Sequence, residues 1–231
     1  MRLLVDADML LYRVGFKYEN ASEEECLSGL TDCIKWMEEV CESDTTEFYL
    51  SCSRNKSFRF ELNPEYKATR GDRKPVHFSL LRDTLINEYK AVVPETEEAD
   101  DLIGIEQTND PENTICCTVD KDILYGVVGG KMKFTTGEIF YTSEDDAQYF
   151  FYRQLLMGDT ADNVKGINKI GDVKSHKLLK FYYGDEEALY QTVLEQYENQ
   201  YGQSAKEKLL LTGRMLKIRT YPNEVWELPF D

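Results

Sequence analysis

The sequence predicts an α/β protein in which a mostly parallel central sheet is flanked by helices. Short apolar runs that are typical of buried strands occur in RLLVDAD (2–8), at 47–52 and at 114–119. Segments with apolar residues at helical spacing separate them, at 22–42, 77–90 and 97–108. Strands that alternate with helices in this way favour a parallel sheet.

The individual elements follow from local signals. Ser22 and Glu25 form a capping-box pattern at the start of the first predicted helix. The alternating segment 58–62 predicts an edge strand, and 91–93 predicts a short strand before the acidic helix. After residue 145 the pattern is helical. We expect helices at 145–157, 186–200 and 204–216, a compact glycine-containing run at 164–184, and a last strand at 215–219. The division is therefore 1–157 for the α/β part and 158–231 for the helical part.

Composition places the chain in a broad class. Its 231 residues suit one mid-sized domain with a small appendage. No apolar run approaches the roughly 20 residues that span a bilayer, and MRLLVDAD does not have the form of a signal peptide. We therefore expect a cytoplasmic protein with no membrane partner. The 6 cysteines form no CxxC pair and only 2 histidines are present, so a zinc site is not expected and the thiols should be reduced.

The net charge of −16 argues at first against a nucleic-acid partner. The charge is unevenly distributed, however. Residues 54–74 carry seven Lys or Arg against three acids, and residues 165–180 carry five Lys against Asp172 alone. Such segregation predicts local basic contact surfaces on an acidic body, although either stretch alone agrees equally well with chance clustering on solvated helices.

Acidic residues gather at four distant places in the sequence. The densest is ETEEADDLIG (95–104), with five carboxylates in seven residues. Acids at a helix N-terminus are stabilised by the helix dipole, which alone could explain this segment. Acids also follow the predicted strands, however, and the carboxyl ends of parallel strands meet at one edge of a sheet. A convergent set of carboxylates suits Mg²⁺ or Mn²⁺, and two such ions can flank a phosphodiester.

The same residues resemble a known family. Five motifs occur in the order and at the spacing found in structure-specific 5′ nucleases, the flap endonucleases and 5′→3′ exonucleases, from residue 3 to about 180. They are VDAD (5–8), PEYKATR (64–70), EADD (98–101), TVDKD (118–122) and GDTADN (158–163). The small size looks most like a free-standing, phage-type member acting in DNA replication.

The resemblance implies a PIN-like nuclease core over 1–157, with a short gateway or arch at about 54–90. Over 158–231 it implies a helix–three-turn–helix DNA-binding subdomain. The implied metal ligands are Asp6, Glu98, Asp100 and Asp120 for a first Mg²⁺, and Asp122, Asp159 and Asp162 for a second, with Asp101 supporting either. Asp8 is less secure because relatives vary there. Mn²⁺ is expected to substitute, and K⁺ is expected at the helix–three-turn–helix.

Further roles carry over by position. Lys67 and Arg70 would contact the scissile phosphate, and Tyr66 would stack on a terminal base. The other residues expected to bind DNA are Arg59, Arg73, Lys74, Lys165, Gly166, Lys169, Gly171, Lys174 and Lys177. The glycines permit close backbone approach to phosphate at a helix N-terminus. The predicted function is metal-dependent hydrolysis of phosphodiester bonds near a 5′ end, nick or flap of DNA by a monomeric enzyme, with RNA–DNA hybrids as a further substrate.

Two departures from the family pattern leave an alternative open. Cys52 occupies a position where relatives often have another aspartate, and Lys169 and Val173 replace a typical glycine and lysine of the hairpin. A DNA-binding module with little or no catalysis therefore remains a second hypothesis. An RNA-cleaving relative with a similar core is a third.

Overall fold

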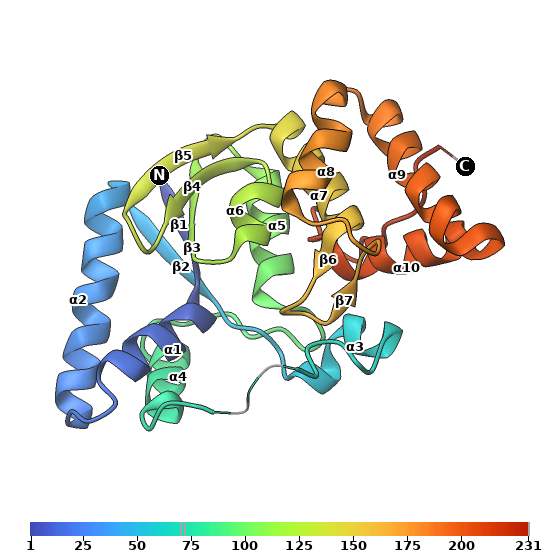
Figure 1. Cartoon of the computed structure of the whole chain (residues 1–231). Coiled ribbons are helices and arrows are strands. Elements are labelled where there is room, and N and C mark those ends of the chain that lie inside the picture. Colours follow the sequence, from blue (N-terminus) through green and yellow to red (C-terminus); the bar gives the residue numbers. More distant parts are fainter. Residues whose placement is uncertain (70, 72, 231) are drawn as a thin grey trace.

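Five strands form one central sheet in the order β2-β1-β3-β4-β5 (Figure 1). The computed structural model describes residues 1–69, 71 and 73–230. The strands are β1 (Arg2–Asp6), β2 (Thr45–Tyr49), β3 (Thr114–Thr118), β4 (Gly129–Lys133) and β5 (Glu138–Thr142). β1 to β4 pair in parallel and β5 runs antiparallel to β4. The predicted α/β class with a mostly parallel sheet is confirmed.

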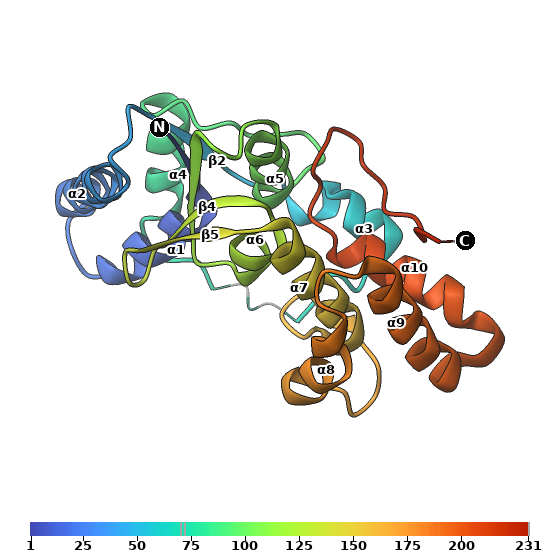
Figure 2. The same ribbon diagram turned by 90° about the horizontal axis from the view of Figure 1, so that it is seen from above.

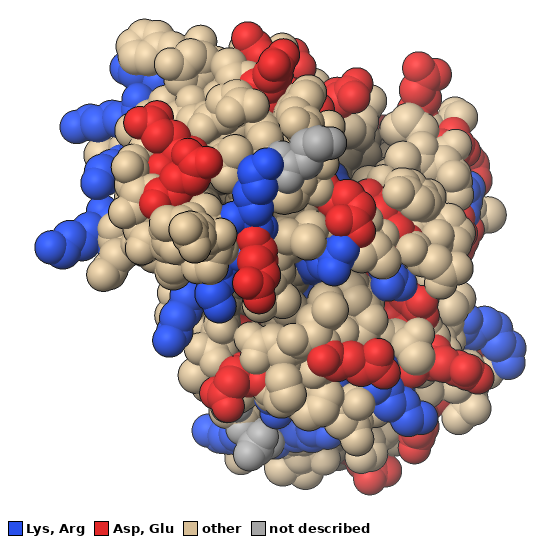
Figure 3. Space-filling model, turned by 90° about the vertical axis from the view of Figure 1, so that its right-hand side faces the viewer, with Lys and Arg blue, Asp and Glu red and all other residues tan. Residues whose placement is uncertain are grey.

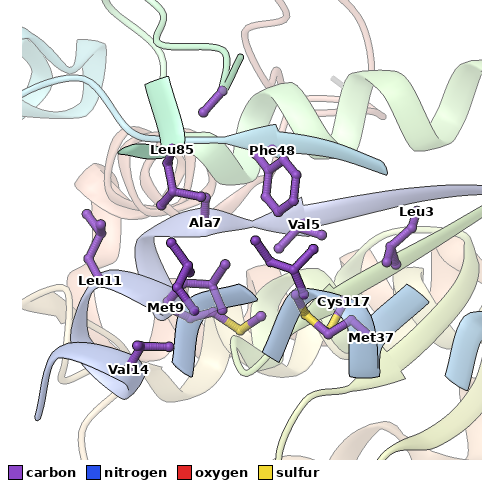
Figure 4. Close-up of a cluster of buried hydrophobic side chains, with 14 of the residues drawn as sticks. Leu3, Val5, Ala7, Met9, Leu11, Val14, Met37, Phe48, Leu85 and Cys117 are labelled. Atoms are coloured by element: carbon purple, nitrogen blue, oxygen red, sulfur yellow. The ribbon is translucent and has the colours of Figure 1, made fainter. Parts of the chain in front are cut away.

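The sheet is covered by helices on both faces. They are α1 (Ala7–Lys17), α2 (Glu23–Cys41), α4 (Phe78–Asn87), α5 (Ala99–Asn109) and α6 (Lys121–Gly126). Leu3 and Val5 point into the core beneath α1, α2 and α4, where Met37 and Leu85 pack against them (Figure 4). Leu4, between them in the strand, points to the opposite face and packs with Ile103 of α5. β1 is thus apolar on both faces, as parallel strands between two helix layers require.

A second group of helices lies beside the sheet (Figures 1 and 2). It consists of α7 (Glu144–Met157), α8 (Asp172–Leu179), α9 (Glu186–Tyr201) and α10 (Ala205–Leu216), with the short turns η2 (Lys180–Tyr182) and η3 (Gly202–Ser204). Tyr152, Leu189 and Leu209 are fully buried in its separate hydrophobic core. A two-stranded hairpin of β6 (Gly158–Asp159) and β7 (Val164–Lys165) follows α7.

The segment predicted as an edge strand at 58–62 is instead the short helix α3 (Phe58–Leu62), which follows the turn η1 (Arg54–Lys56). Ser57 caps this helix, because its side chain accepts a hydrogen bond from the Arg59 amide. In FRFEL, apolar and polar residues alternate as they do in an edge strand. The first of its polar residues, Arg59, is nevertheless buried, with only 2% of its surface exposed.

Other elements differ from the sequence-based expectation. The predicted strand at 215–219 is the last turn of α10 followed by extended chain, and 91–93 forms only a single bridge from Val92 to Tyr49. The β4–β5 hairpin and helix α1 were not predicted. The capping box of Ser22 and Glu25 is confirmed. Among the described residues, no helix is both long enough and apolar enough to cross a membrane.

Candidate active site

The carboxyl ends of β1 and β3 place two aspartates side by side. Asp6 ends β1, and its carboxylate accepts a hydrogen bond of 2.8 Å from the Thr118 hydroxyl at the end of β3. The same hydroxyl accepts a bond of 3.0 Å from the Asp120 amide. Asp120 then caps α6 by accepting from the Asp122 amide at 2.8 Å. The predicted convergence of acids from separate strands is therefore present at this edge.

A cavity of about 240 Å³ opens at this edge of the sheet. Four carboxylates line it, with one lysine: Asp6, Asp8, Asp100, Asp120 and Lys67. Burial raises the pKa of Asp6 to about 7, and repulsion by Asp8 adds to the shift. Burial likewise raises the pKa of Asp100, with further contributions from Asp120 and Asp6. These carboxylates are crowded enough to disfavour one another's charge, and a bound cation would relieve the repulsion.

Glu98 lies at the start of α5 and is held by three side chains. Its carboxylate forms an ion pair with Lys67, accepts a hydrogen bond of 2.7 Å from the Tyr66 hydroxyl and pairs with Arg59 at 3.1 Å. Burial raises the pKa of Glu98, but attraction to Lys67 and Arg59 outweighs it, and the resulting pKa is lowered to about 2. Glu98 is therefore fully ionised at neutral pH.

A second group of acids lies around Lys121. The Lys121 ammonium bonds to Asp122 at 2.8 Å and also to Asp159. Asp122 accepts a further bond of 2.6 Å from the Gln154 amide. Burial and repulsion by Asp120 raise the pKa of Asp122 to about 6. Lys121 and Gln154 were not predicted from the sequence, although Lys121 stands between the two aspartates of the DKD motif.

Asp162 is the third acid predicted to bind a second ion. It connects the group of side chains around Glu98 with the group around Lys121. Its carboxylate accepts a bond of 3.0 Å from the Tyr66 hydroxyl, which also bonds Glu98. The chain around it is held at main-chain level. The Lys67 amide donates to the Asp162 carbonyl at 3.0 Å, and the Asn163 side chain donates to the Glu65 carbonyl at 2.9 Å. The turn at 63–69 is thus fixed to the loop at 159–163; we refer to this contact as the backbone latch.

The donor set fits a hard divalent cation, because it consists of carboxylate oxygens only. Within the described residues, however, no three or more His, Cys, Asp or Glu side chains stand in a ready-made metal-binding arrangement. Lys67 and Lys121 instead occupy Glu98, Asp122 and Asp159 with ion pairs. A bound ion would replace these lysines as the partner of the carboxylates.

Three predicted site residues have different surroundings from those expected. Asp101 is fully buried, and its two oxygens accept bonds of 2.6 and 2.8 Å from Arg59 and one of 3.1 Å from the Arg219 amide. This corrects the prediction of Asp101 as a metal ligand. Arg59 and Tyr66 are each 2% exposed. They support Glu98 from inside the protein, which corrects the prediction that they contact DNA.

Of the other predicted gateway residues, Arg73 and Lys74 lie at the surface. Arg73 is mostly exposed and pairs weakly with Glu19 at 3.4 Å. Lys74 lies over the Phe78 ring at 4.4 Å. Arg70, predicted to contact the phosphate, falls outside the described residues.

Lys67 itself has a left-handed backbone with φ of 54°, which turns its side chain toward Glu98.

Cys52 lies near Glu98 at the same end of the sheet. Burial raises the pKa of its thiol to about 11, and the neighbouring charges of Glu98 and Glu97 add to this shift. The thiol is therefore uncharged at neutral pH and adds no negative charge to the site.

The predicted helix–three-turn–helix forms an exposed basic segment after the second carboxylate group. Gly158 and Gly166 meet so closely that a Cβ on Gly158 would lie 2.3 Å from the Gly166 nitrogen. Gly171 caps α8 and has open space around its Cα. The predicted DNA-binding lysines Lys165, Lys169, Lys174 and Lys177 are all exposed, as is Lys180. From the side of the helical group, basic side chains gather along one edge of the molecule (Figure 3).

Comparisons with known proteins agree with this arrangement. No family model matches the chain. A 5′-3′ exonuclease of Buchnera aphidicola subsp. Schizaphis graminum is 24% identical over 204 residues, which cover 77% of this chain and 69% of that protein. DNA polymerase I of Caldicellulosiruptor bescii is 25% identical over 228 residues, covering 84% of this chain but only 26% of the polymerase.

Solved structures show the same fold. A variant of the T5 5′-exonuclease has a TM-score of 0.64 at 18% identity, covering 95% of this chain and 89% of the other. The bacteriophage T5 flap endonuclease in complex with DNA and metal ions has a TM-score of 0.54 at 16% identity, with 90% and 96% covered. The catalytic core of Rad2 in complex with a DNA substrate has 0.51 at 17%, with 90% and 67% covered. The chain therefore has the fold of the structure-specific 5′ nucleases, and its resemblance to that family is confirmed.

Proposed function

We propose that this chain is a divalent-metal-dependent 5′→3′ exonuclease or flap endonuclease that hydrolyses phosphodiester bonds near the 5′ ends of DNA. The observation that carries the proposal is the cavity at the carboxyl edge of the sheet, where four carboxylates, from β1, α1, α5 and the start of α6, lie with Lys67. A surface meant only to bind a polyanion would gain nothing from this concentration of negative charge. A cation-dependent site needs it.

The expected ions are two Mg²⁺, with Mn²⁺ as a substitute. Asp6, Asp100 and Asp120 would hold one, with Glu98 once Lys67 has moved away, and Asp122, Asp159 and Asp162 would hold the other. When bound, such a pair lowers the pKa of an attacking water and stabilises the leaving oxygen.

The chain's own residues have separate tasks. Lys67, on leaving Glu98, would place its ammonium against the scissile phosphate and offset charge that builds up there. Tyr66 and Arg59 would keep Glu98 in position, because both bond its carboxylate from the buried side. The lysines of the helix–three-turn–helix would bind the duplex phosphates away from the cut, in a salt-dependent manner. The same segment is where we expect K⁺.

The test uses a duplex with a 5′ flap, labelled at its 5′ end, in Mg²⁺, Mn²⁺ or EDTA. We expect release of mononucleotides or of the intact flap in either metal and none in EDTA, and the product size distinguishes exonuclease from endonuclease activity. Asp120→Asn should abolish cleavage, whereas Asp110→Asn, on a loop outside the site, should not. A matched single-stranded RNA tests for an RNA-cleaving enzyme.

A second candidate is a DNA-binding module with the nuclease fold but without useful catalysis. The uncharged Cys52 thiol beside Glu98 favours it. Tight binding of the flapped duplex without cleavage in Mg²⁺ or Mn²⁺ would select this alternative, and Cys52→Asp would then be the first variant to test for restored activity.

A further inference from the structure

A cavity of about 250 Å³ lies away from the carboxylate site, between α3, the end of α10 and the C-terminal segment. Phe58 and Leu62 of α3 form one wall, and Val225 and Trp226 form another. Its cationic lining residues are Arg214, Lys217 and Arg219, and its acidic ones are Glu61 and Glu224. No role in the proposed nuclease reaction uses this cavity.

Lys217 has an unusual position in it. No hydrogen bond or ion pair joins its ammonium to any part of the chain that the structure describes; the nearest favourable contact is the Phe151 ring, at 5.2 Å. Burial lowers the pKa of this lysine, although Glu224 and Glu186 partly oppose the shift. Lys217 lines the cavity together with Arg214 and Arg219. A largely buried cation without a partner is unfavourable unless something in the cavity satisfies it.

The other charged groups of the cavity already have partners or lie in water. Arg214 pairs with Glu227 at 2.5 Å, and Arg219 pairs with Glu97 at 3.1 Å. The Glu224 carboxylate bonds the amide and the hydroxyl of Thr220. Glu61 is exposed. Lys217 is therefore the charge in this cavity that a ligand can still neutralise.

The walls favour a flat partner. The Arg219 and Arg59 guanidinium groups both lie over the Phe58 ring, with their carbons 3.9 and 4.5 Å from its centre, so this ring offers its edge to the cavity. Trp226 is held against α10, where a Cβ on Gly213 would lie 2.1 Å from the indole. Two fixed aromatic rings and two aliphatic side chains around one free ammonium form a pocket that is apolar at the sides and cationic at one point.

We propose that this cavity binds a small anion carried on a flat ring, with its carboxylate or phosphate on the Lys217 ammonium and its ring against Trp226 and the edge of Phe58. The volume is large enough for a single substituted ring. This site is separate from the proposed nuclease function and does not depend on it.

The cavity is nevertheless joined to the carboxylate site by main-chain contacts. The carbonyls of Met215 and Lys217 accept bonds of 3.0 and 2.8 Å from Arg59, whose two terminal nitrogens also donate to Glu98 and Asp101.

Trp226 provides the measurement. The chain has only 2 Trp, so Trp36→Phe leaves Trp226 as the sole indole. We would titrate this variant with phenyl phosphate, benzoate and inorganic phosphate, without DNA or divalent metal. We expect a saturable change in Trp226 fluorescence with one or both ring-bearing anions, and comparison of the two identifies the preferred anionic group. Inorganic phosphate should bind at least about tenfold more weakly.

Lys217→Met in the same background should weaken binding about tenfold or more, the usual consequence of losing a charged hydrogen bond. Lys217→Arg should retain part of it. The matched control is Lys208→Met, which removes one exposed positive charge from α10 and should bind normally. Far-ultraviolet circular dichroism and thermal unfolding check that each variant folds.

Three results would overturn the proposal. They are no saturable signal with either ring-bearing anion at millimolar concentration, equal binding by Lys217→Met in a folded protein, and equal binding of inorganic phosphate. Because none involves cleavage of DNA, failure here is distinguishable from failure of the proposed nuclease function.

Discussion

Arg59 of α3 and Asp101 of α5 form a two-point ion pair inside the protein, with nitrogen–oxygen distances of 2.6 and 2.8 Å. Their side chains are 2% and 0% exposed. Arg59 also reaches the carbonyls of Met215, in the last turn of α10, and of Lys217 just after it. This single side chain therefore links the gateway, the first carboxylate group and the C-terminal helical part.

Arg59→Leu should lower the free energy of unfolding by about 3–5 kcal/mol, because it leaves Asp101 as a buried charge without its partner. Urea denaturation measures this. The double variant Arg59→Leu/Asp101→Leu should recover part of the loss, since no buried charge remains. The control is Arg73→Leu, which breaks the exposed pair with Glu19 and should cost less than about 1 kcal/mol. If Arg59→Leu lowers the free energy of unfolding by no more than the control does, burial of the Arg59–Asp101 pair does not make it important for stability.

Lys67→Ala should reduce kcat for flap cleavage by about 10²–10³-fold, the range seen when one preorganised electrostatic group is removed. The affinity for DNA in Ca²⁺ should change by less than tenfold, because the duplex is expected to bind mainly through the lysines after residue 164. Single-turnover kinetics separates the two effects. Lys56→Ala removes an exposed charge from the neighbouring turn η1 and is the control. Equal losses in both variants would mean that Lys67 acts only through net charge.

Cys52→Asp should make stability more dependent on divalent metal. A carboxylate at this position would add negative charge beside Glu98, so in EDTA we expect a loss on the order of 1–3 kcal/mol. Saturating Mg²⁺ should restore most of it, and the Mg²⁺ concentration for half-maximal cleavage should fall. Cys52→Ser is the uncharged control. Thermal unfolding with and without Mg²⁺ measures this change in stability. An equal loss of stability in both conditions would argue against an ion near residue 52.

Lys131 of β4 gives a pH-dependent prediction. It is fully buried and bonds Gln107 at 2.6 Å, and burial lowers its pKa to about 8, from 10.5. Between these two values the unfolded chain binds more protons at this residue than the folded chain, so its contribution to stability rises with pH from about 8 to 10.5 and is lowest below 8. The shift corresponds to roughly 3 kcal/mol at most.

Lys131→Met removes this dependence, so the variant provides the comparison. The free energy of unfolding of the unmodified chain, minus that of the variant, should rise as pH increases from 7 to 10. Taking the difference cancels the titration of the cysteines other than Cys116, whose thiol interacts with the Lys131 ammonium. A difference that is flat across this range would show that the pKa of Lys131 is not lowered in the folded protein.

The sequence predicted the structure well wherever a pattern among neighbouring residues was enough to place them in the fold. Asp6 and Asp120 follow apolar strands, and because parallel strands end at a common edge, their convergence could be predicted without knowing the strand order. The capping box at Ser22 was equally readable, since all of its contacts lie within four residues.

The sequence was less informative where residues far apart in the chain determine the surroundings of a side chain or the conformation of a segment. Arg59 looked like a surface cation in an alternating strand because nothing in FRFEL indicates Asp101, 42 residues away, which makes burial of the charge favourable. Tyr66 stood among charged residues, yet its hydroxyl bonds two carboxylates that approach from different elements. The strand predicted at 215–219 failed for a similar reason, because its extended chain is held by the Arg59 side chain and not by a neighbouring strand.

The backbone latch between the turn at 63–69 and the loop at 159–163 has a consequence for how this protein can change in evolution. Lys67 and Asn163 both have left-handed backbones, with φ of 54° and 57°, and the Lys67 amide bonds the Asp162 carbonyl. An amide–carbonyl bond is indifferent to most side-chain replacements. Asn163 is the exception, because its side chain supplies the second bond of the latch. Drift at the other positions of the two segments can therefore change their side chains while the main-chain bond between them is inherited unchanged.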